Sequence, residues 1–89
     1  MNPRWIPPEA GVVRDPAAAI GVARLIWFSM NPDLPPSSAD VWNSRMAAML
    51  EHGVWKVAPR PLPSGSVGGG LEIDISASDG RVVGIYVTQ

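Results

Sequence analysis

The chain has 89 residues, of which 46% are hydrophobic, so we expect one small domain with a core and not a disordered chain. Its formal net charge is −1 and its charges are scattered, which argues against a nucleic-acid partner because no basic stripe is available for phosphates. It has no cysteine, which excludes disulfides and thiolate chemistry and permits a cytosolic location. Its longest apolar stretch is too short to span a bilayer, so no membrane attachment is expected.

Residues 1–14 are predicted to form an extended arm, because three prolines disfavour a helix there. A first helix is then predicted over residues 16–30. Asp15 is a favourable N-cap, and Pro16 suits the first helical position because its missing N–H would have no partner there. Apolar residues at spacings of three and four form one stripe, which comprises Ala19, Ile20, Ala23, Ile26, Trp27 and Met30. The helix ends before Pro32, since the residue that precedes a proline avoids the helical conformation.

The stretch after this helix is predicted to begin with an irregular connector over residues 31–43, which hold three prolines. Its continuation allows two interpretations. In the first, Ser37 or Ser38 caps a second helix over residues 39–51, which Gly53 terminates. Helix propensity slightly favours this interpretation.

In the second interpretation, residues 44–50 form a strand, residues 51–53 a three-residue turn and residues 54–58 a second strand. Gly53 would then take the left-handed conformation that such a turn needs. The register expected for this hairpin places Met49 opposite Trp55 and Ala47 opposite Val57. Composition alone does not decide between the helix and the hairpin.

A C-terminal hairpin is predicted from strands at 70–76 and 82–88, after a loop rich in proline and glycine. Alternation places Leu71, Ile73 and Ile75 on one side of the first strand and its two carboxylates on the other. A three-residue loop over residues 78–80 keeps the apolar side chains on one face, whereas a one-residue slip would reverse the faces. The expected pairs are Ile75 with Val83, Ile73 with Ile85 and Leu71 with Val87.

The fold class expected from these elements is α+β, with an N-terminal helix packed on a small antiparallel sheet of about four strands. Eight residues are expected to be buried in the core: Ile20, Ala23, Trp27, Trp55, Leu71, Ile73, Ile85 and Val87.

Few residues suggest chemistry. His52 is the only histidine and there is no cysteine, so neither a metal ion nor another cofactor is expected. Glu72 and Asp74 share one strand face, where two carboxylates serve acid–base catalysis only if burial separates their pKa values. Nothing in the sequence predicts such burial, so this face is interpreted as a solvated surface or a surface for protein binding. Trp5 and Trp42 fall in irregular segments and are either exposed anchors for a partner or lids over the core.

Three segments, in their order and spacing, resemble the NTF2-fold immunity proteins of bacterial toxin systems. The first, GVVRDPAAAIGVARLIW over residues 11–27, is similar to the opening helix of that family. The second, RMAAMLEHGVWKV over residues 45–57, is similar to its strand, short turn and tryptophan-containing strand. The third, LPSGSVGGGLEIDISASDGRVVGIYVTQ over residues 62–89, resembles its LP turn, glycine-rich strand entry and final hairpin. The proline-rich connector over residues 32–36 departs from the family, in which a shorter loop is usual.

The resemblance favours the strand at 44–50 and implies an NTF2/cystatin-like domain over residues 15–89. It also implies a cytoplasmic, non-catalytic protein that binds and neutralises a cognate bacterial toxin. It transfers no catalytic or binding residue, because the contact surface differs from pair to pair. Our own candidates for toxin contacts are Glu72, Asp74, Tyr86, Trp5 and Trp42. The first three are expected on the strand face turned away from the core.

Two other functions are alternatives to toxin neutralisation. A PepSY-like binding or regulatory module combines a similar alanine-rich helix, tryptophan-containing strand and final hairpin, but such modules usually occur in exported or membrane-attached proteins. A small enzyme of the NTF2 superfold would need a deep cone lined by polar catalytic groups, and fold alone does not imply such an activity.

Overall fold

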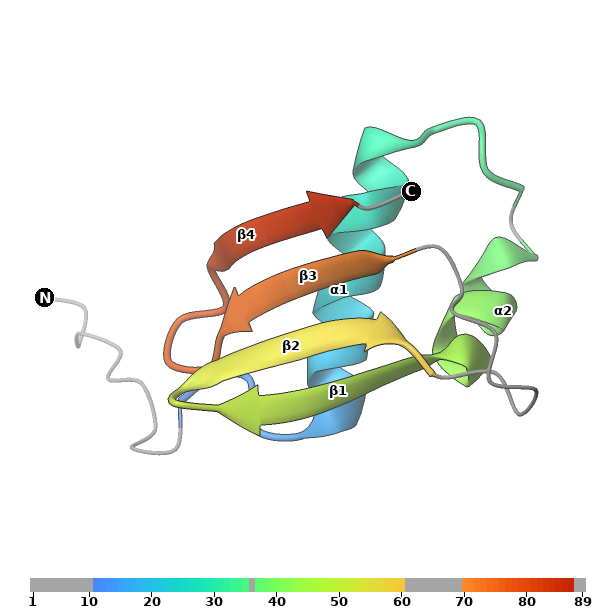
Figure 1. Cartoon of the computed structure of the whole chain (residues 1–89). Coiled ribbons are helices and arrows are strands. Elements are labelled where there is room, and N and C mark those ends of the chain that lie inside the picture. The colour runs from blue at the N-terminus through green and yellow to red at the C-terminus, as the bar shows by residue number, and fades with distance from the viewer. Residues whose placement is uncertain (1–10, 36, 61–69, 88–89) are drawn as a thin grey trace, which may run out of the picture.

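The computed structural model describes residues 11–35, 37–60 and 70–87, and within them it confirms the predicted α+β fold (Figure 1). The elements in chain order are α1 (Pro16–Met30), α2 (Ser38–Arg45), β1 (Met46–Glu51), β2 (Val54–Pro59), β3 (Leu71–Ser76) and β4 (Val82–Val87). The four strands form one antiparallel sheet in the order β1-β2-β3-β4, so each strand pairs with the next one along the chain. Neither helix is long and apolar enough to cross a membrane, as far as the described residues go.

The α1 helix has the predicted bounds and the predicted cap. The Asp15 carboxylate accepts a hydrogen bond from the Ala18 N–H at 2.7 Å, which satisfies one of the donors left free at a helix start. At the other end, the Asn31 side-chain amide donates to the Trp27 carbonyl at 2.8 Å. Ala19 and Ala23 are fully buried, so the helix approaches the sheet through small side chains.

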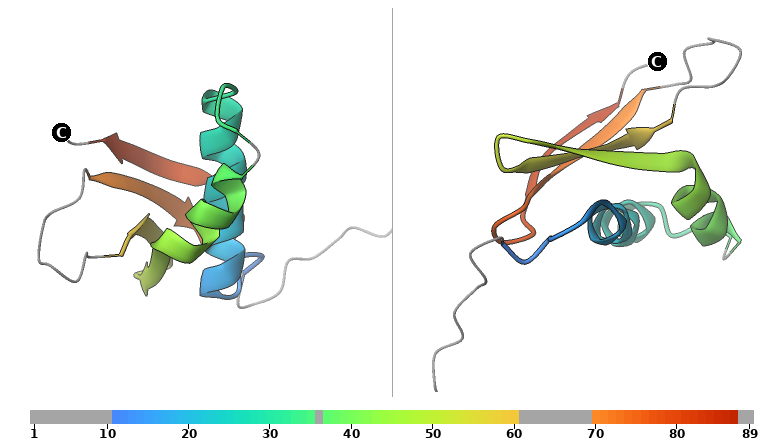
Figure 2. Two further views of the ribbon diagram at one scale, coloured as in Figure 1. Left: turned by 90° about the vertical axis from the view of Figure 1, so that its right-hand side faces the viewer. Right: turned by 90° about the horizontal axis from the view of Figure 1, so that it is seen from below.

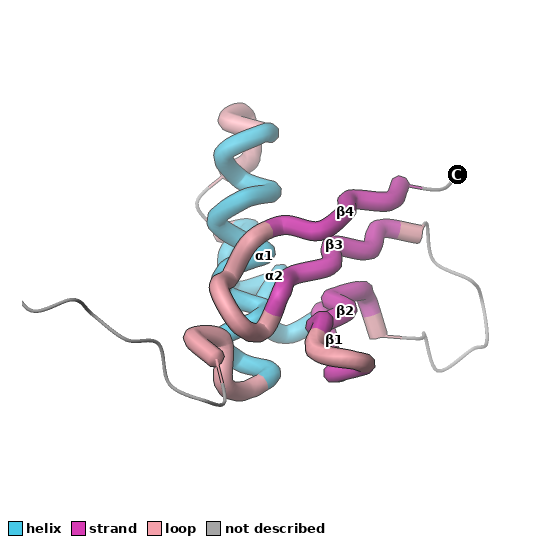
Figure 3. The backbone as a smooth tube through the Cα atoms, turned by 90° about the vertical axis from the view of Figure 1, so that its left-hand side faces the viewer, coloured by secondary structure: helices cyan, strands magenta, loops and turns pink. Residues whose placement is uncertain are grey.

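Both helices lie on the same side of the sheet (Figures 2 and 3). The α1 helix packs mainly against β1 and β2, less against β3, and α2 packs against α1. The opposite side of the sheet carries no helix among the described elements. We call that side the open face; its central side chains are those of Lys56, Glu72, Asp74 and Tyr86.

The ambiguous stretch contains both a helix and a strand. Residues 38–45 form α2, so the predicted connector over residues 31–43 is wrong in its second half. The strand predicted at 44–50 is confirmed as β1, displaced to residues 46–51. Ser37 stands at the N-cap position of α2 but makes no side-chain capping hydrogen bond. The residues of high helix propensity at 46–50 thus form a strand, because pairing with β2 overrides local propensity.

The register predicted for the first hairpin is wrong by one residue. Glu51 pairs with Val54, so the loop has two residues, His52 and Gly53, and not three. Both loop residues have positive φ, 51° and 76°, as expected for a tight turn that matches the twist of its strands. The shift pairs Leu50 with Trp55 and Ala48 with Val57. It also turns Met49 outward, where 67% of its surface is exposed.

The register predicted for the second hairpin is correct in two of its three pairs. Leu71 pairs with Val87 and Ile73 with Ile85, as expected. A β-bulge between Asp74 and Ile75 then shifts the pairing, so that the partner of Ile75 is Val82 and not Val83. Because the bulge adds a residue to one strand, alternation alone could not locate it.

The core lies between α1 and the first three strands. Its fully buried members with the largest side chains are Val57, Ile73 and Ile75. Of the predicted core, Ala23, Trp55 and Ile73 are buried, and four more pack partly buried against it: Ile20, Trp27, Leu71 and Ile85. Val87 is the exception at 65% exposed, because α1 packs toward β1 and β2 and leaves the end of β4 uncovered.

The segment before α1 is hydrogen-bonded to the turn between β3 and β4. The N–H groups of Val12 and Val13 donate to the carbonyls of Ser78 and Ala77, at 3.3 and 3.1 Å. The Val13 carbonyl accepts from the indole Nε1 of Trp55 at 2.8 Å, and Val13 itself is buried. The last residues of the predicted arm thus belong to the core.

Candidate functional site

The open face brings Glu72, Asp74 and Tyr86 together, as alternation predicted. Glu72 on β3 is the cross-strand partner of Tyr86 on β4, and Asp74 is the partner of Gly84 on the same strand. On the other side of β3, Asp74 is paired in register with Lys56 of β2. The site is therefore built on three adjacent strands, which hold its side chains within one or two positions of each other.

Asp74 is buried although it lies on the open face. Only 7% of its surface is exposed, and its Oδ1 atom makes no hydrogen bond to any described residue. Lys56 forms its ion pair with Glu51 instead, since its ammonium lies 3.6 Å from Glu51 Oε2. The sequence did not predict this burial, because alternation along one strand does not show what packs over it.

Tyr86 folds back along β4. A Cβ atom built on Gly84 would lie 2.7 Å from the Tyr86 hydroxyl and 2.9 Å from two ring carbons. The ring therefore occupies the space above Gly84, directly across from Asp74. Tyr86 itself remains 54% exposed, so its outer side is available for contact. A glycine two residues before an aromatic residue in a strand is the sequence signal for this arrangement.

The two carboxyl groups interact. The pKa of Glu72 is raised, first by a side-chain hydrogen bond to Asp74, then by loss of solvent and by the negative charge of Asp74. Lys56 opposes the shift and lowers the pKa, while the more distant Glu51 raises it further. A raised pKa means that Glu72 holds a proton more readily than a lone glutamate does. Chemically, two adjacent carboxyl groups suit a cation that donates hydrogen bonds.

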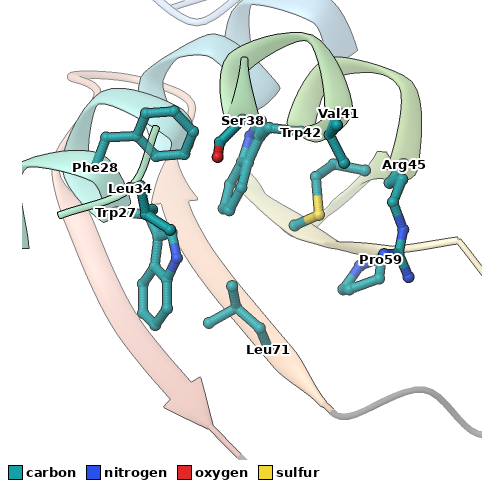
Figure 4. Close-up of a pocket in the computed structure, with 10 residues that line it drawn as sticks. Trp27, Phe28, Leu34, Ser38, Val41, Trp42, Arg45, Pro59 and Leu71 are labelled. Atoms are coloured by element: carbon teal, nitrogen blue, oxygen red, sulfur yellow. The ribbon is translucent and has the colours of Figure 1, made fainter. Parts of the chain in front are cut away.

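A second concave site lies where the helices meet the end of the sheet (Figure 4). It has a volume of about 260 Å³, near the lower limit for small-molecule pockets. Ten residues line it: Trp27, Phe28, Leu34, Ser38, Val41, Trp42, Arg45, Met46, Pro59 and Leu71. The lining is mostly apolar, and the hydroxyl of Ser38 and the guanidinium of Arg45 are its polar side-chain groups.

Trp42 and Trp5 do not join the open face. Trp42 belongs to α2 and not to an irregular segment, and it is only 8% exposed. Its indole Nε1 donates to the Ile20 carbonyl at 3.0 Å, and its ring meets that of Phe28 edge-to-face at 5.8 Å. Trp42 is thus a lid over one end of the core and not an exposed anchor for a partner. Trp5 lies outside the described residues.

No metal site is assembled in residues 11–35, 37–60 and 70–87: they contain no group of three or more His, Asp or Glu side chains placed to hold an ion. His52 is exposed in the β1–β2 turn.

Comparison of the chain with protein-family models, curated protein sequences and solved structures gives no match. The resemblance to immunity proteins therefore rests on the three sequence segments quoted above, and the function that it implies is a proposal.

Proposed function

We propose that this protein is a non-catalytic inhibitor that protects a bacterial cell by binding a cognate toxin in the cytoplasm. The observation that carries the proposal is the open face, which the helices leave uncovered and which combines a pair of acidic residues with an exposed tyrosine. The resemblance to NTF2-fold immunity proteins supplies the type of partner.

The chemistry of the open face supports a protein partner. Tyrosine is enriched at protein interfaces because it combines a large apolar surface with a polar tip. Glu72 and Asp74 add negative charge, which would attract a basic active-site cleft and raise the rate of association. The strands fix these groups on a rigid surface, so that little conformational entropy is lost on binding.

The proposal is tested by co-expressing the chain with the toxin domain encoded beside its gene. Wild-type protein should restore growth and co-purify with the toxin. The double variant Glu72→Ala/Asp74→Ala should bind more weakly. Asp33→Ala/Asp40→Ala is the matched control, because it removes the same charge from exposed positions in the loop after α1 and in α2.

Two results would contradict different parts of the proposal. If wild-type protein neither restores growth nor forms a complex, the immunity function is wrong. If both double variants protect the cell and bind as tightly as wild type, the function stands and the open face is not the contact surface.

A further inference from the structure

The starting observation is one unsatisfied oxygen of the Asp74 carboxylate, Oδ1. A buried charged oxygen without a hydrogen bond is destabilising, and such atoms in native proteins are nearly always satisfied by a protein group, a water molecule or a ligand. Asp74 is 7% exposed, and its Oδ1 atom has no partner among the described residues. A donor from outside the chain would satisfy it.

The neighbouring strands provide no such donor. On β2, Lys56 is paired with Glu51 of β1. On β4, the position opposite Asp74 is Gly84, and the Tyr86 hydroxyl that lies over this glycine makes no hydrogen bond to Asp74 Oδ1. On β3 itself, Glu72 adds a second carboxyl group and not a counter-charge. The described surroundings thus leave an excess of negative charge beside an exposed aromatic ring.

We propose that Glu72 and Asp74 form the binding site for one arginine side chain of the partner protein, with the guanidinium hydrogen-bonded to both carboxylates and stacked on Tyr86. A guanidinium has five N–H donors in a planar fork, so one group serves two carboxylates at once. Its flat face also stacks on aromatic rings, and the Tyr86 ring is 54% exposed next to the pair. The partner's identity rests on the function proposed above, whereas the site itself does not.

The raised pKa of Glu72 agrees with this role. The Asp74 side chain raises the pKa of Glu72, because it disfavours a second negative charge beside it. A bound guanidinium supplies positive charge at the same place, so binding should lower the pKa of Glu72. By linkage, the affinity should fall as the solution is acidified through that pKa. The other charged or titratable groups facing the pair are Lys56, Glu51 and Tyr86.

The site is tested on the free protein by NMR titration with methylguanidinium chloride. We expect shifts concentrated at Glu72, Asp74 and Tyr86, and a lowered pKa for Glu72. Tetramethylammonium chloride is the control ligand, because it has the same charge but no N–H donor. An equal response to both salts would overturn the proposal, since it would show a general effect of ionic strength.

Three variants define the residues involved. Glu72→Gln and Asp74→Asn should abolish the methylguanidinium shifts, and the first remains informative if the second, at a buried position, does not fold. Glu51→Gln removes the same charge from the same face but from a group already paired with Lys56, so it should retain them. Retention of the shifts in a folded Glu72→Gln or Asp74→Asn protein would contradict the site.

Binding to the toxin separates this inference from the proposed function. Glu72→Gln should weaken toxin binding by about 30-fold or more, because it removes one of the two carboxylates that hold the guanidinium, while Glu51→Gln should change it little. If toxin binding is observed and Glu72→Gln leaves it unchanged, the arginine site is wrong and the function stands. If methylguanidinium binds as described but no toxin does, the site stands and the function is wrong.

Discussion

At the scale of single residues, the two buried tryptophans perform different tasks. Each donates its indole N–H to a backbone carbonyl, Trp55 to Val13 and Trp42 to Ile20. The Ile20 carbonyl lies inside α1, where a helical N–H also bonds it. The Val13 carbonyl precedes the helix and has the indole as its partner. The sequence predicted a buried Trp55, but not a bond to a residue 42 positions away.

Trp55→Phe should therefore destabilise the protein more than Trp42→Phe. The first substitution leaves the Val13 carbonyl buried without its donor, which costs about 1–3 kcal/mol, whereas the second leaves Ile20 its helical bond. Urea denaturation of both variants measures the difference. Equal losses in the two proteins would mean that the Trp55 hydrogen bond adds nothing beyond ring packing.

Two carboxyl groups of the second hairpin should affect stability with opposite dependence on pH. The pKa of Glu72 is raised in the folded protein, chiefly by Asp74. The folded state therefore gains stability from Glu72 only while this side chain is protonated. That gain is complete at low pH and is lost as the pH rises through and above the ordinary glutamate pKa, about 4.3. The pKa of Asp79 is lowered because its carboxylate accepts the Arg81 N–H, so its contribution is lost as the pH falls. Asp79 therefore serves as the internal comparison.

Glu72→Gln should remove the first of these effects. Compared with wild type, the variant should gain stability as the pH is raised from about 4 to about 7, because it lacks the carboxylate that Asp74 repels. Unfolding by urea at several pH values gives the difference directly. A difference that stays constant over this range would show that the two carboxyl groups do not interact.

At the scale of elements, local signals located most of the structure and long-range contacts decided the rest. Asp15 and Pro16 predicted the start of α1, because capping depends on adjacent residues only. The predicted register of the first hairpin was wrong by one residue, because the two-residue loop needs a positive φ at His52, which is uncommon for a residue other than glycine. Alternation placed Ile73 and Val87 on one face, but it carries no information on how far α1 extends over that face.

Ile73 and Val87 should therefore respond differently to truncation. Ile73 is fully buried between α1 and the sheet, so Ile73→Ala should cost about 2–5 kcal/mol, through lost contacts and the cavity that remains. Val87 is 65% exposed, and Val87→Ala should change stability by less than about 0.5 kcal/mol. Chemical denaturation of the two proteins tests the pair. A large loss for Val87→Ala would indicate that something covers β4 in solution.

At the scale of the whole molecule, the carboxylate site was only partly predictable. The sequence placed Glu72, Asp74 and Tyr86 on one face, and the structure confirms that placement. The surroundings of Asp74 include the Tyr86 ring over Gly84 and the ion pair between Lys56 and Glu51, and both are side-chain arrangements that involve more than one residue position. The alternation of side chains along a single strand predicts neither arrangement.

The junction between the segment before α1 and the β3–β4 turn depends on Gly11. Its φ is +89°, and a Cβ atom there would collide with the Ala77 carbonyl oxygen, so Gly11→Ala must distort the junction. We expect it to cost more than about 1 kcal/mol. Gly21→Ala is the control: it lies within α1 with free space around the new methyl group, and it should stabilise by about 0.5–1 kcal/mol. Thermal denaturation measures the melting temperature of both variants. If the two melting temperatures changed by the same amount and in the same direction, the junction would contribute nothing to stability.

The same junction determines the order in which a newly made chain can finish folding. The α1 helix and the β1–β2 hairpin use contacts near in sequence, so they can form while synthesis continues. Val12 and Val13 find their backbone partners at Ser78 and Ala77, which the ribosome adds much later. Until then the Trp55 indole has only a loosely held Val13 carbonyl to bond. Residues 11–13 therefore cannot take their final place before residues 77 and 78 have been made.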